Sequence, residues 1–242
     1  MRAIGVLDDV TQLYRLDPSG MINRIAAFPM QCKQAIEQAT KVLLPADYRE
    51  IEQIVVVGMG GSGVGGDLIR GLTLQSQGVP IYLWQDYGLP LWANDQTLVI
   101  IASYSGNTAE ALSAYDMAIK NGIRLIAITS GGILAQRAKD HGCPLVILPY
   151  QGEPRTALGY SFVVPLVLIW RLGLCTNQLG ALEEALIDLQ EKAVIYGTNS
   201  VTASNPAKQL AIRLYGRTTV IYATNYLAAA ARRWKTQINE NA

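Results

Sequence analysis

The sequence has few of the residues that build metal sites and disulfide scaffolds, with one histidine and three cysteines in 242 residues. Cys32, Cys143 and Cys175 are widely spaced and form no CxxC pair. Such a sparse set predicts reduced, buried thiols, as in a cytoplasmic protein, and not a disulfide framework or a zinc site. We therefore expect no metal.

An excess of one charge and long apolar runs are lacking as well. Twenty Lys and Arg residues oppose 19 Asp and Glu residues, so the net charge of +1 favours neither nucleic acid nor an anionic membrane surface. The longest apolar run, Phe162–Trp170, is far shorter than the roughly 20 residues of a membrane span, and the N-terminus lacks a signal-peptide pattern. We expect a small-molecule ligand, no nucleic acid and no membrane.

Half of the residues are hydrophobic, which is enough to build a substantial core. From about residue 53, short apolar runs alternate with helical segments, a pattern typical of a doubly wound parallel sheet. The predicted strands span 54–57, 80–84, 98–102, 125–129 and 145–148, and helices are expected to begin near residues 63, 108 and 132. Because each run is apolar throughout, both faces of the sheet should be covered.

The predicted fold class is α/β, with a five-stranded parallel sheet flanked by helices. The expected segments are a helical N-terminal part (1–50, with a turn at 17–20), the sheet domain (51–152), a helical connector (153–216) and the start of a second domain (217–242). In the last segment a strand over 218–222 should precede a helix from about residue 225. One strand and one helix cannot close a sheet, so we expect this second domain to be incomplete.

A glycine-rich motif, GMGGSGVGGD, follows the first predicted strand directly and opens a helix. Glycines permit positive φ and close backbone approach, so amide groups can surround an anion where the helix dipole favours negative charge. Gly58, Gly60 and Gly63 also satisfy GxGxxG, with Asp86 near the place of a ribose-binding carboxylate. Dinucleotide binding and a ligand-free tight turn therefore stay open as alternatives, whereas the lysine of a nucleotide-binding P-loop is missing.

A hydroxyl-rich motif, SYSGNTAE, follows the third predicted strand, so it should lie at the same edge of the sheet. We expect Ser105 or Thr108 to cap the helix that starts there. A plain cap needs one hydroxyl, whereas Ser103, Ser105 and Thr108 supply three. Several neutral donors at a helix N-terminus can hold a phosphate without a lysine. The motif therefore indicates a phosphate site, with capping alone as the alternative.

These two motifs, together with EPRTALGY (153–160) and RWKTQINEN (233–241), carry a resemblance to a known family. The hydroxyl-rich loop is similar to the SxSGxT loop of the sugar isomerase (SIS) superfamily. All four blocks in this order resemble the bifunctional phosphoglucose/phosphomannose isomerases, over nearly the whole chain from about residue 15. The resemblance implies an SIS-type fold and a homodimeric, cytoplasmic enzyme of glycolysis and gluconeogenesis that acts on hexose 6-phosphates without a cofactor.

The resemblance also implies roles for individual residues. The sugar site would be lined by Gly60, Gly61 and Ser62, the phosphate held by Ser103, Ser105 and Thr108, the enediolate stabilised by Arg155, and the proton moved by Glu240. Aldose–ketose isomerisation through a cis-enediolate requires such a carboxylate and a cation near the developing oxyanion. The alternatives to these roles are a solvated loop arginine for Arg155 and an exposed glutamate near a frayed terminus for Glu240.

The sequence departs from the family pattern in one respect. The family also uses a histidine and a lysine from later in the second SIS domain, whereas His141, the only histidine here, should end a helix inside the first domain. We therefore expect this chain to lack part of the active site and to turn over little substrate. A non-catalytic phosphosugar sensor and, further off, a dinucleotide-dependent oxidoreductase are the alternative functions.

Overall fold

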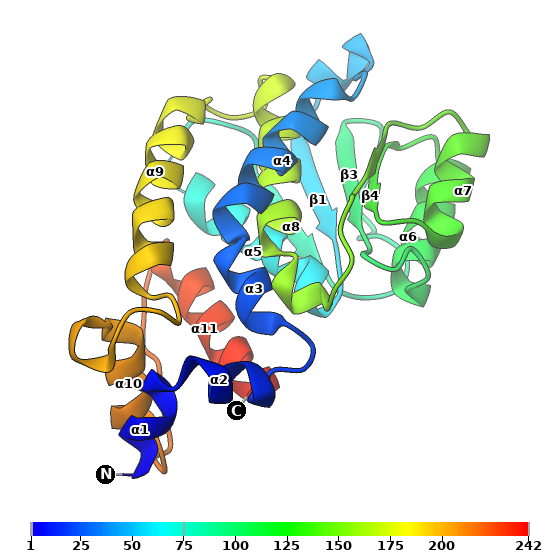
Figure 1. The fold of residues 1–242 in the computed structure, drawn as a ribbon. Helices are drawn as coiled ribbons and strands as arrows, with labels where there is room; N and C mark the ends of the chain where they lie inside the picture. The colour runs from blue at the N-terminus through cyan, green and yellow to red at the C-terminus, as the bar shows by residue number, and fades with distance from the viewer. Residues whose placement is uncertain (1, 75, 242) are drawn as a thin grey trace.

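The structure, a computed structural model, describes residues 2–74 and 76–241. Its centre is a parallel sheet with the strand order β2-β1-β3-β4-β5 (Figure 1). The strands are β1 (Gln53–Val57), β2 (Ile81–Trp84), β3 (Thr97–Ala102), β4 (Arg124–Thr129) and β5 (Leu145–Ile147). All five predicted strands and the α/β class are thus confirmed. From β2 the chain crosses to β3, on the other side of β1, so the strand order reverses between β1 and β3. Ligands bind at this switch point in such sheets.

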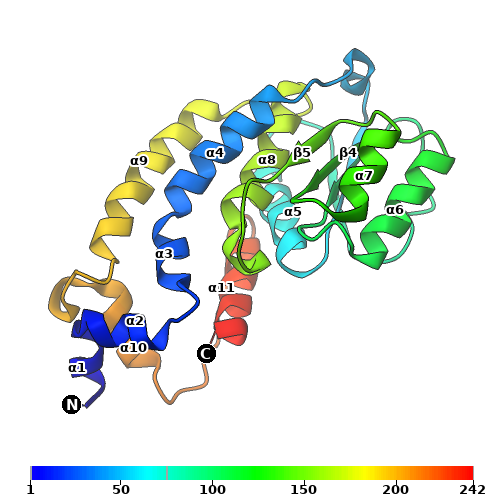
Figure 2. The same ribbon diagram turned by 45° about the vertical axis from the view of Figure 1, so that its right-hand side comes forward.

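Helices cover both faces of this sheet, as the uninterrupted apolar strands predict (Figure 2). The helices on one face are α4 (Phe28–Lys41), α5 (Gly60–Thr73) and α8 (Leu158–Arg171), and those on the other are α6 (Ala109–Lys120) and α7 (Gly132–Asp140). Since strand side chains alternate, Ile54 and Val56 join the first core and Val55 and Val57 the second. Nearly every residue of α8 is buried, which explains why its sequence is apolar all round.

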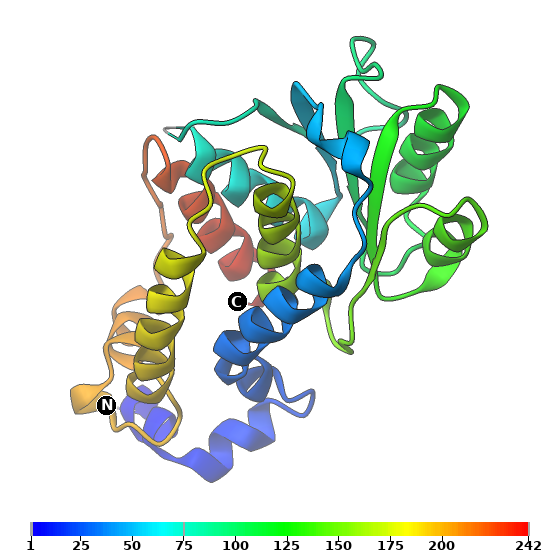
Figure 3. The same cartoon turned by 90° about the horizontal axis from the view of Figure 1, so that it is seen from above.

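The remaining helices lie beside the first face and below it in Figure 1. They are α1 (Arg2–Asp8), α2 (Val10–Leu16), α3 (Met21–Ala26), α9 (Leu179–Ile195), α10 (Pro206–Leu214) and α11 (Leu227–Asn241), with the 3-10 turns η1 (Ala46–Arg49), η2 (Pro154–Thr156) and η3 (Thr202–Ser204). Helix α11 packs along α5, as Figure 3 shows from above. Among the described helices, none is both long and apolar enough to cross a membrane.

The strand predicted over residues 218–222 is wrong. Residues 218–224 form neither strand nor helix and run alongside α11, with Val220 and Tyr222 largely exposed. The β-branched run favours a strand locally, but a strand needs a neighbour for its backbone groups, and no described segment pairs with this one. Residues 153–216, expected to be helical, contain α8, α9 and α10, with residues 172–178 between α8 and α9.

Asp17 stabilises the start of α3, and its replacement tests the structure of the N-terminal helices. Its carboxylate accepts hydrogen bonds from the backbone amides of Ile22 (2.7 Å) and Met21 (2.9 Å), and these lower its pKa. Because the pKa of Asp17 is lower in the folded chain than in the unfolded chain, its carboxylate stabilises the fold at pH values above the unfolded-state pKa. This contribution is lost as the pH falls through the folded-state pKa. Asp17→Ala should therefore destabilise the chain by about 1 kcal/mol at pH 7. Urea unfolding at pH 7 and at pH 3 checks this, and a difference from the unsubstituted chain that fails to shrink in acid would contradict it.

Candidate functional site

The glycine-rich loop after β1 and the hydroxyl-rich loop after β3 touch each other at the carboxyl edge of the sheet. The Ser62 hydroxyl accepts a hydrogen bond from the backbone amide of Tyr104 at 3.2 Å. Gly61, Ser62, Ser103 and Tyr104 line one small hollow together with Pro154 and Ser161. The structure therefore brings the two predicted loops together at the switch point of the sheet.

Two glycines of the first loop are favoured for different reasons, one for its backbone conformation and the other for a close backbone contact. Gly60 has a φ of +49°, and a Cβ atom on Gly61 would lie 3.1 Å from the carbonyl carbon and oxygen of Pro154. Pro154 opens η2, the turn that carries Arg155, so the loop packs directly against the segment bearing the predicted cation. Helix α5 begins here without a side-chain cap, which leaves its N-terminus suited to an anion.

The hydroxyl-rich loop is built differently from the predicted helix cap. Thr108 does occupy the N-cap position of α6, but its hydroxyl lies 2.9 Å from the buried Ser103 hydroxyl and makes no capping hydrogen bond. The exposed Ser105 hydroxyl accepts from the Asn107 amide at 3.2 Å. Thr108 is thus the N-cap residue, as predicted, but the expected capping hydrogen bond is not formed because Ser103 engages its hydroxyl. The first turn of α6 therefore has no side-chain partner of its own, as an anion site requires.

Sequence reasoning missed the loop after β4, which braces the hydroxyl-rich loop. The Asn107 side-chain oxygen accepts from the Ile133 amide at 3.0 Å, and Ser130 donates its amide (3.0 Å) and hydroxyl (2.6 Å) to the Tyr104 carbonyl. Gly106 has a φ of +68°, and a Cβ atom there would lie 1.9 Å from the Gly131 carbonyl oxygen. A signal was present, since Ser-Gly-Gly at 130–132 also follows a strand directly.

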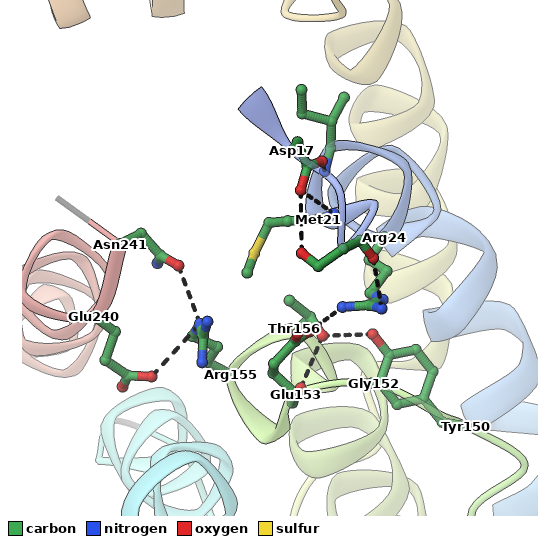
Figure 4. A network of polar contacts seen from close by, with 12 residues as sticks. Asp17, Met21, Arg24, Tyr150, Gly152, Glu153, Arg155, Thr156, Glu240 and Asn241 are labelled. Atoms are coloured by element: carbon green, nitrogen blue, oxygen red, sulfur yellow. Dashed lines mark hydrogen bonds and ion pairs between the residues drawn. The ribbon is translucent and has the colours of Figure 1, made fainter. Parts of the chain in front are cut away.

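Arg155 and Glu240, 85 positions apart in sequence, lie beside each other (Figure 4). The Arg155 Nε atom is 3.9 Å from the Glu240 carboxylate and donates a 3.0 Å hydrogen bond to the Asn241 side-chain oxygen. Both side chains are partly exposed, at 27% for Arg155 and 42% for Glu240. A cation and a carboxylate are thus held together beside the glycine-rich loop, while both stay accessible to a ligand.

A network of hydroxyls and charges fixes the other side of the Arg155 turn (Figure 4). Arg24 on α3 forms an ion pair with Glu153, and the Tyr150 hydroxyl lies 2.6 Å from that of Thr156. The pKa of the Glu153 carboxylate is lowered, first by the hydrogen bond that it accepts from its own backbone amide and second by the hydrogen bond from Arg24. The ion pair therefore persists at neutral pH. The residues that flank Arg155 are therefore anchored to the N-terminal helices.

Tyr104 joins this network to the hydroxyl-rich loop, and sequence reasoning gave it no role. Its hydroxyl donates to the Tyr150 carbonyl at 2.8 Å and accepts from the Gly152 amide at 3.1 Å. Burial raises the pKa of the Tyr104 hydroxyl, which keeps it neutral and able to do both. The loops that carry Ser103, Ser105 and Arg155 thus share one support.

Asp86 and His141 do not line the hollow between the two loops. Asp86 is exposed beyond β2, where its carboxylate accepts a hydrogen bond from the Tyr87 amide at 2.7 Å. His141 ends α7, as predicted, with Nδ1 2.9 Å from the Tyr115 hydroxyl, at the opposite end of that helix from the site. No three His, Cys, Asp or Glu residues of the described chain are grouped as metal ligands would be.

Comparison with known proteins gives one family model and a set of relatives. The model of the bacterial phospho-glucose isomerase C-terminal SIS domain matches residues 203–242. A bifunctional phosphoglucose/phosphomannose isomerase of Caldicellulosiruptor bescii is 36% identical over 225 residues, covering 91% of this chain and 66% of the relative. One of Aquifex aeolicus is 38% identical over 196 residues, covering 81% of this chain and 57% of the relative.

Solved structures share the fold. A hypothetical protein from Thermus thermophilus superimposes with a TM-score of 0.65 at 21% identity, over 88% of this chain and 53% of the other. Identity at this level speaks for the fold alone. The chain spans between about half and two thirds of the length of the relatives it matches.

Proposed function

Because the chain belongs to the family of bifunctional phosphoglucose/phosphomannose isomerases, we propose that it binds hexose 6-phosphates and interconverts the aldose and ketose forms. The observation that carries this proposal is the meeting of three segments at one sheet edge. The loops bearing Ser62 and Ser103 touch each other, and the Arg155–Glu240 pair lies against the first of them. By the same family membership we propose a homodimer in the cytoplasm, active in glycolysis and gluconeogenesis, with a second SIS domain beginning at about residue 217.

The hydroxyl-rich loop is the proposed phosphate subsite. Thr108 and Ser105 offer accessible hydroxyls, and the uncapped first turn of α6 adds amide groups and the positive end of its dipole. Ser103 is buried and acts through its 2.9 Å contact with Thr108, which fixes the Thr108 hydroxyl. Neutral donors suit this task, since a phosphate dianion accepts several hydrogen bonds at once.

The proposed chemistry uses Glu240 as the base and Arg155 as the oxyanion partner. In the open-chain aldose, Glu240 removes the proton from C2, and the C–H electron pair forms the C1–C2 double bond while the C1 carbonyl oxygen becomes negatively charged. Arg155 stabilises that charge. The proton of the C2 hydroxyl passes to the C1 oxygen, so that the negative charge moves to the C2 oxygen. Glu240 then returns its proton to C1 as the carbonyl forms at C2. One carboxylate near both carbons can do this through a cis-enediolate.

The experiment is a proton-exchange assay, chosen because the chain spans only part of the length of its relatives. The chain is incubated with fructose 6-phosphate in D2O, and deuterium entering at C1 is followed by NMR. We expect slow exchange with fructose 6-phosphate, in line with the small turnover expected from the sequence, and none with fructose. Binding without exchange would favour the phosphosugar sensor. Protection of the fold against heat by NAD(H), at concentrations where fructose 6-phosphate gives none, would favour the oxidoreductase.

Removal of single hydroxyls should weaken phosphate binding. Thr108→Val should raise the Kd for fructose 6-phosphate about tenfold, since a hydrogen bond to a charged group contributes about 1.5 kcal/mol or more. Ser103→Ala should raise this Kd less, because the buried Ser103 hydroxyl only fixes that of Thr108. Isothermal titration measures this, with Ser76→Ala as the control because that hydroxyl only bonds the Thr73 carbonyl at the far end of α5. The affinity for unphosphorylated fructose should not change. Equal losses for both sugars would contradict a phosphate subsite.

A further inference from the structure

Asp67 is a buried carboxylate that the proposed reaction does not use. It closes the glycine-rich motif on α5, and its side chain is only 6% exposed. One oxygen lies 2.9 Å from Arg70 on the same helix and the other 3.0 Å from Arg232 on α11. A buried carboxylate is costly unless each of its oxygens has a partner. Here one of the two partners, Arg232, comes from α11, the helix that carries Glu240.

Helix α11 contacts both ends of Arg155. Arg233 and Gln237 donate to the Arg155 backbone carbonyl, the latter at 3.2 Å, while Asn241 and Glu240 lie against its guanidinium. Spacings of four and three residues from Arg233 to Gln237 to Glu240 place these side chains on one face of the helix. A shift of α11 along its axis would therefore break the contacts to the carbonyl and move Glu240 from the guanidinium together.

Little apolar burial holds α11 in this register. Ala229 and Arg233 are its buried residues, whereas Trp234 and Leu227 are half exposed. The start of α11 packs closely on α5, since a Cβ atom on Gly71 would lie 3.2 Å from the Tyr226 carbonyl oxygen. Farther along, the contacts that cross from α11 are polar, and the Asp67–Arg232 pair ties the helix to the rigid core.

We propose that Asp67 is a positioning residue: through Arg232 it fixes the register of α11 on α5 and thereby sets Glu240 against Arg155. Asp67 itself touches no sugar atom. The catalytic meaning of this pair rests on the proposed function, whereas its effect on α11 does not. Arg232→Gln leaves the buried core unchanged, because the Arg232 side chain is 58% exposed.

The chain offers a matched control, since Arg70→Gln removes the other guanidinium from the same carboxylate without touching α11. In the full chain, amide hydrogen exchange over residues 231–238 should accelerate at least tenfold in Arg232→Gln, should not change in Arg70→Gln, and should largely recover in Arg232→Lys. Asp67→Asn should behave as Arg232→Gln does. Unchanged exchange in Arg232→Gln, or equal acceleration in both glutamine variants, would overturn the proposal.

A kinetic readout separates positioning from simple stabilisation. In the deuterium assay with fructose 6-phosphate, Arg232→Gln should lower kcat about tenfold and leave KM within about twofold, because the phosphate loops do not contact Arg232. A raised KM with unchanged kcat would count against positioning. If the unsubstituted chain shows neither binding nor exchange of the sugar, the isomerase function fails, while amide exchange in α11 still decides the role of Asp67.

Discussion

Replacement of Gly65 by alanine is expected to remove a large part of the stability of the fold. A Cβ atom at this position would lie 1.8 Å from the Ser161 carbonyl oxygen, 2.3 Å from the carbonyl carbon and 2.9 Å from the Phe162 amide nitrogen. All three are backbone atoms of α8, so no rotamer change can make room. Relief requires α5 and α8 to move apart, although both lie in the core on one face of the sheet.

The expected loss is about 3 kcal/mol or more, at the upper end of overpacking in a core, against a total stability of about 5–15 kcal/mol for a typical domain. Urea unfolding followed by circular dichroism measures it. Gly180→Ala is the matched control, because a Cβ atom there meets nothing within 4 Å and alanine favours the helical state of α9. An unfolding midpoint for Gly65→Ala equal to that of the control would contradict the close packing of α5 on α8.

The sheet could be predicted because its signal is local. Each strand is a short apolar run, and burial on both faces follows from the run itself, as Val55 and Val56 show by joining opposite cores. The meeting of the loops that carry Ser62 and Ser103 was also predictable, since the carboxyl ends of parallel strands share an edge. The failed strand at 218–222 has an equally local signal, but pairing depends on a neighbour that the run cannot specify.

The candidate site beyond these loops depends on helix packing and could not be read from spacing. Nothing in the sequence near Arg155 indicates that Glu240 lies 3.9 Å away, and only the family resemblance suggested the pair. The Asp67–Arg232 contact joins two helices 165 positions apart in the same way. The hydrogen bonds of Thr108 could not be predicted either, because its hydroxyl contacts the Ser103 side chain instead of the helix amides. Such pairings depend on three-dimensional neighbours.

Glu240→Gln is expected to lower the rate of proton exchange into fructose 6-phosphate by about a hundredfold to ten-thousandfold, while the Kd stays within about twofold. General-base catalysis contributes about 10² to 10⁴ in rate, and an amide cannot accept the C1 proton. Glutamine keeps the shape of the side chain and its place on α11. The phosphate loops, which should supply most of the affinity, do not include it. NMR exchange and isothermal titration measure the two quantities separately.

Each outcome assigns the carboxylate a different role. Exchange that survives in Glu240→Gln would place the base elsewhere and leave the 3.9 Å contact with Arg155 as an ordinary ion pair. Loss of binding together with exchange would make Glu240 a ligand-binding group, since a pure base affects only the chemical step. Glu184→Gln on α9, an exposed glutamate outside the site, should change neither quantity. Selective loss of exchange is therefore the result that distinguishes an isomerase from a sensor built on the same fold.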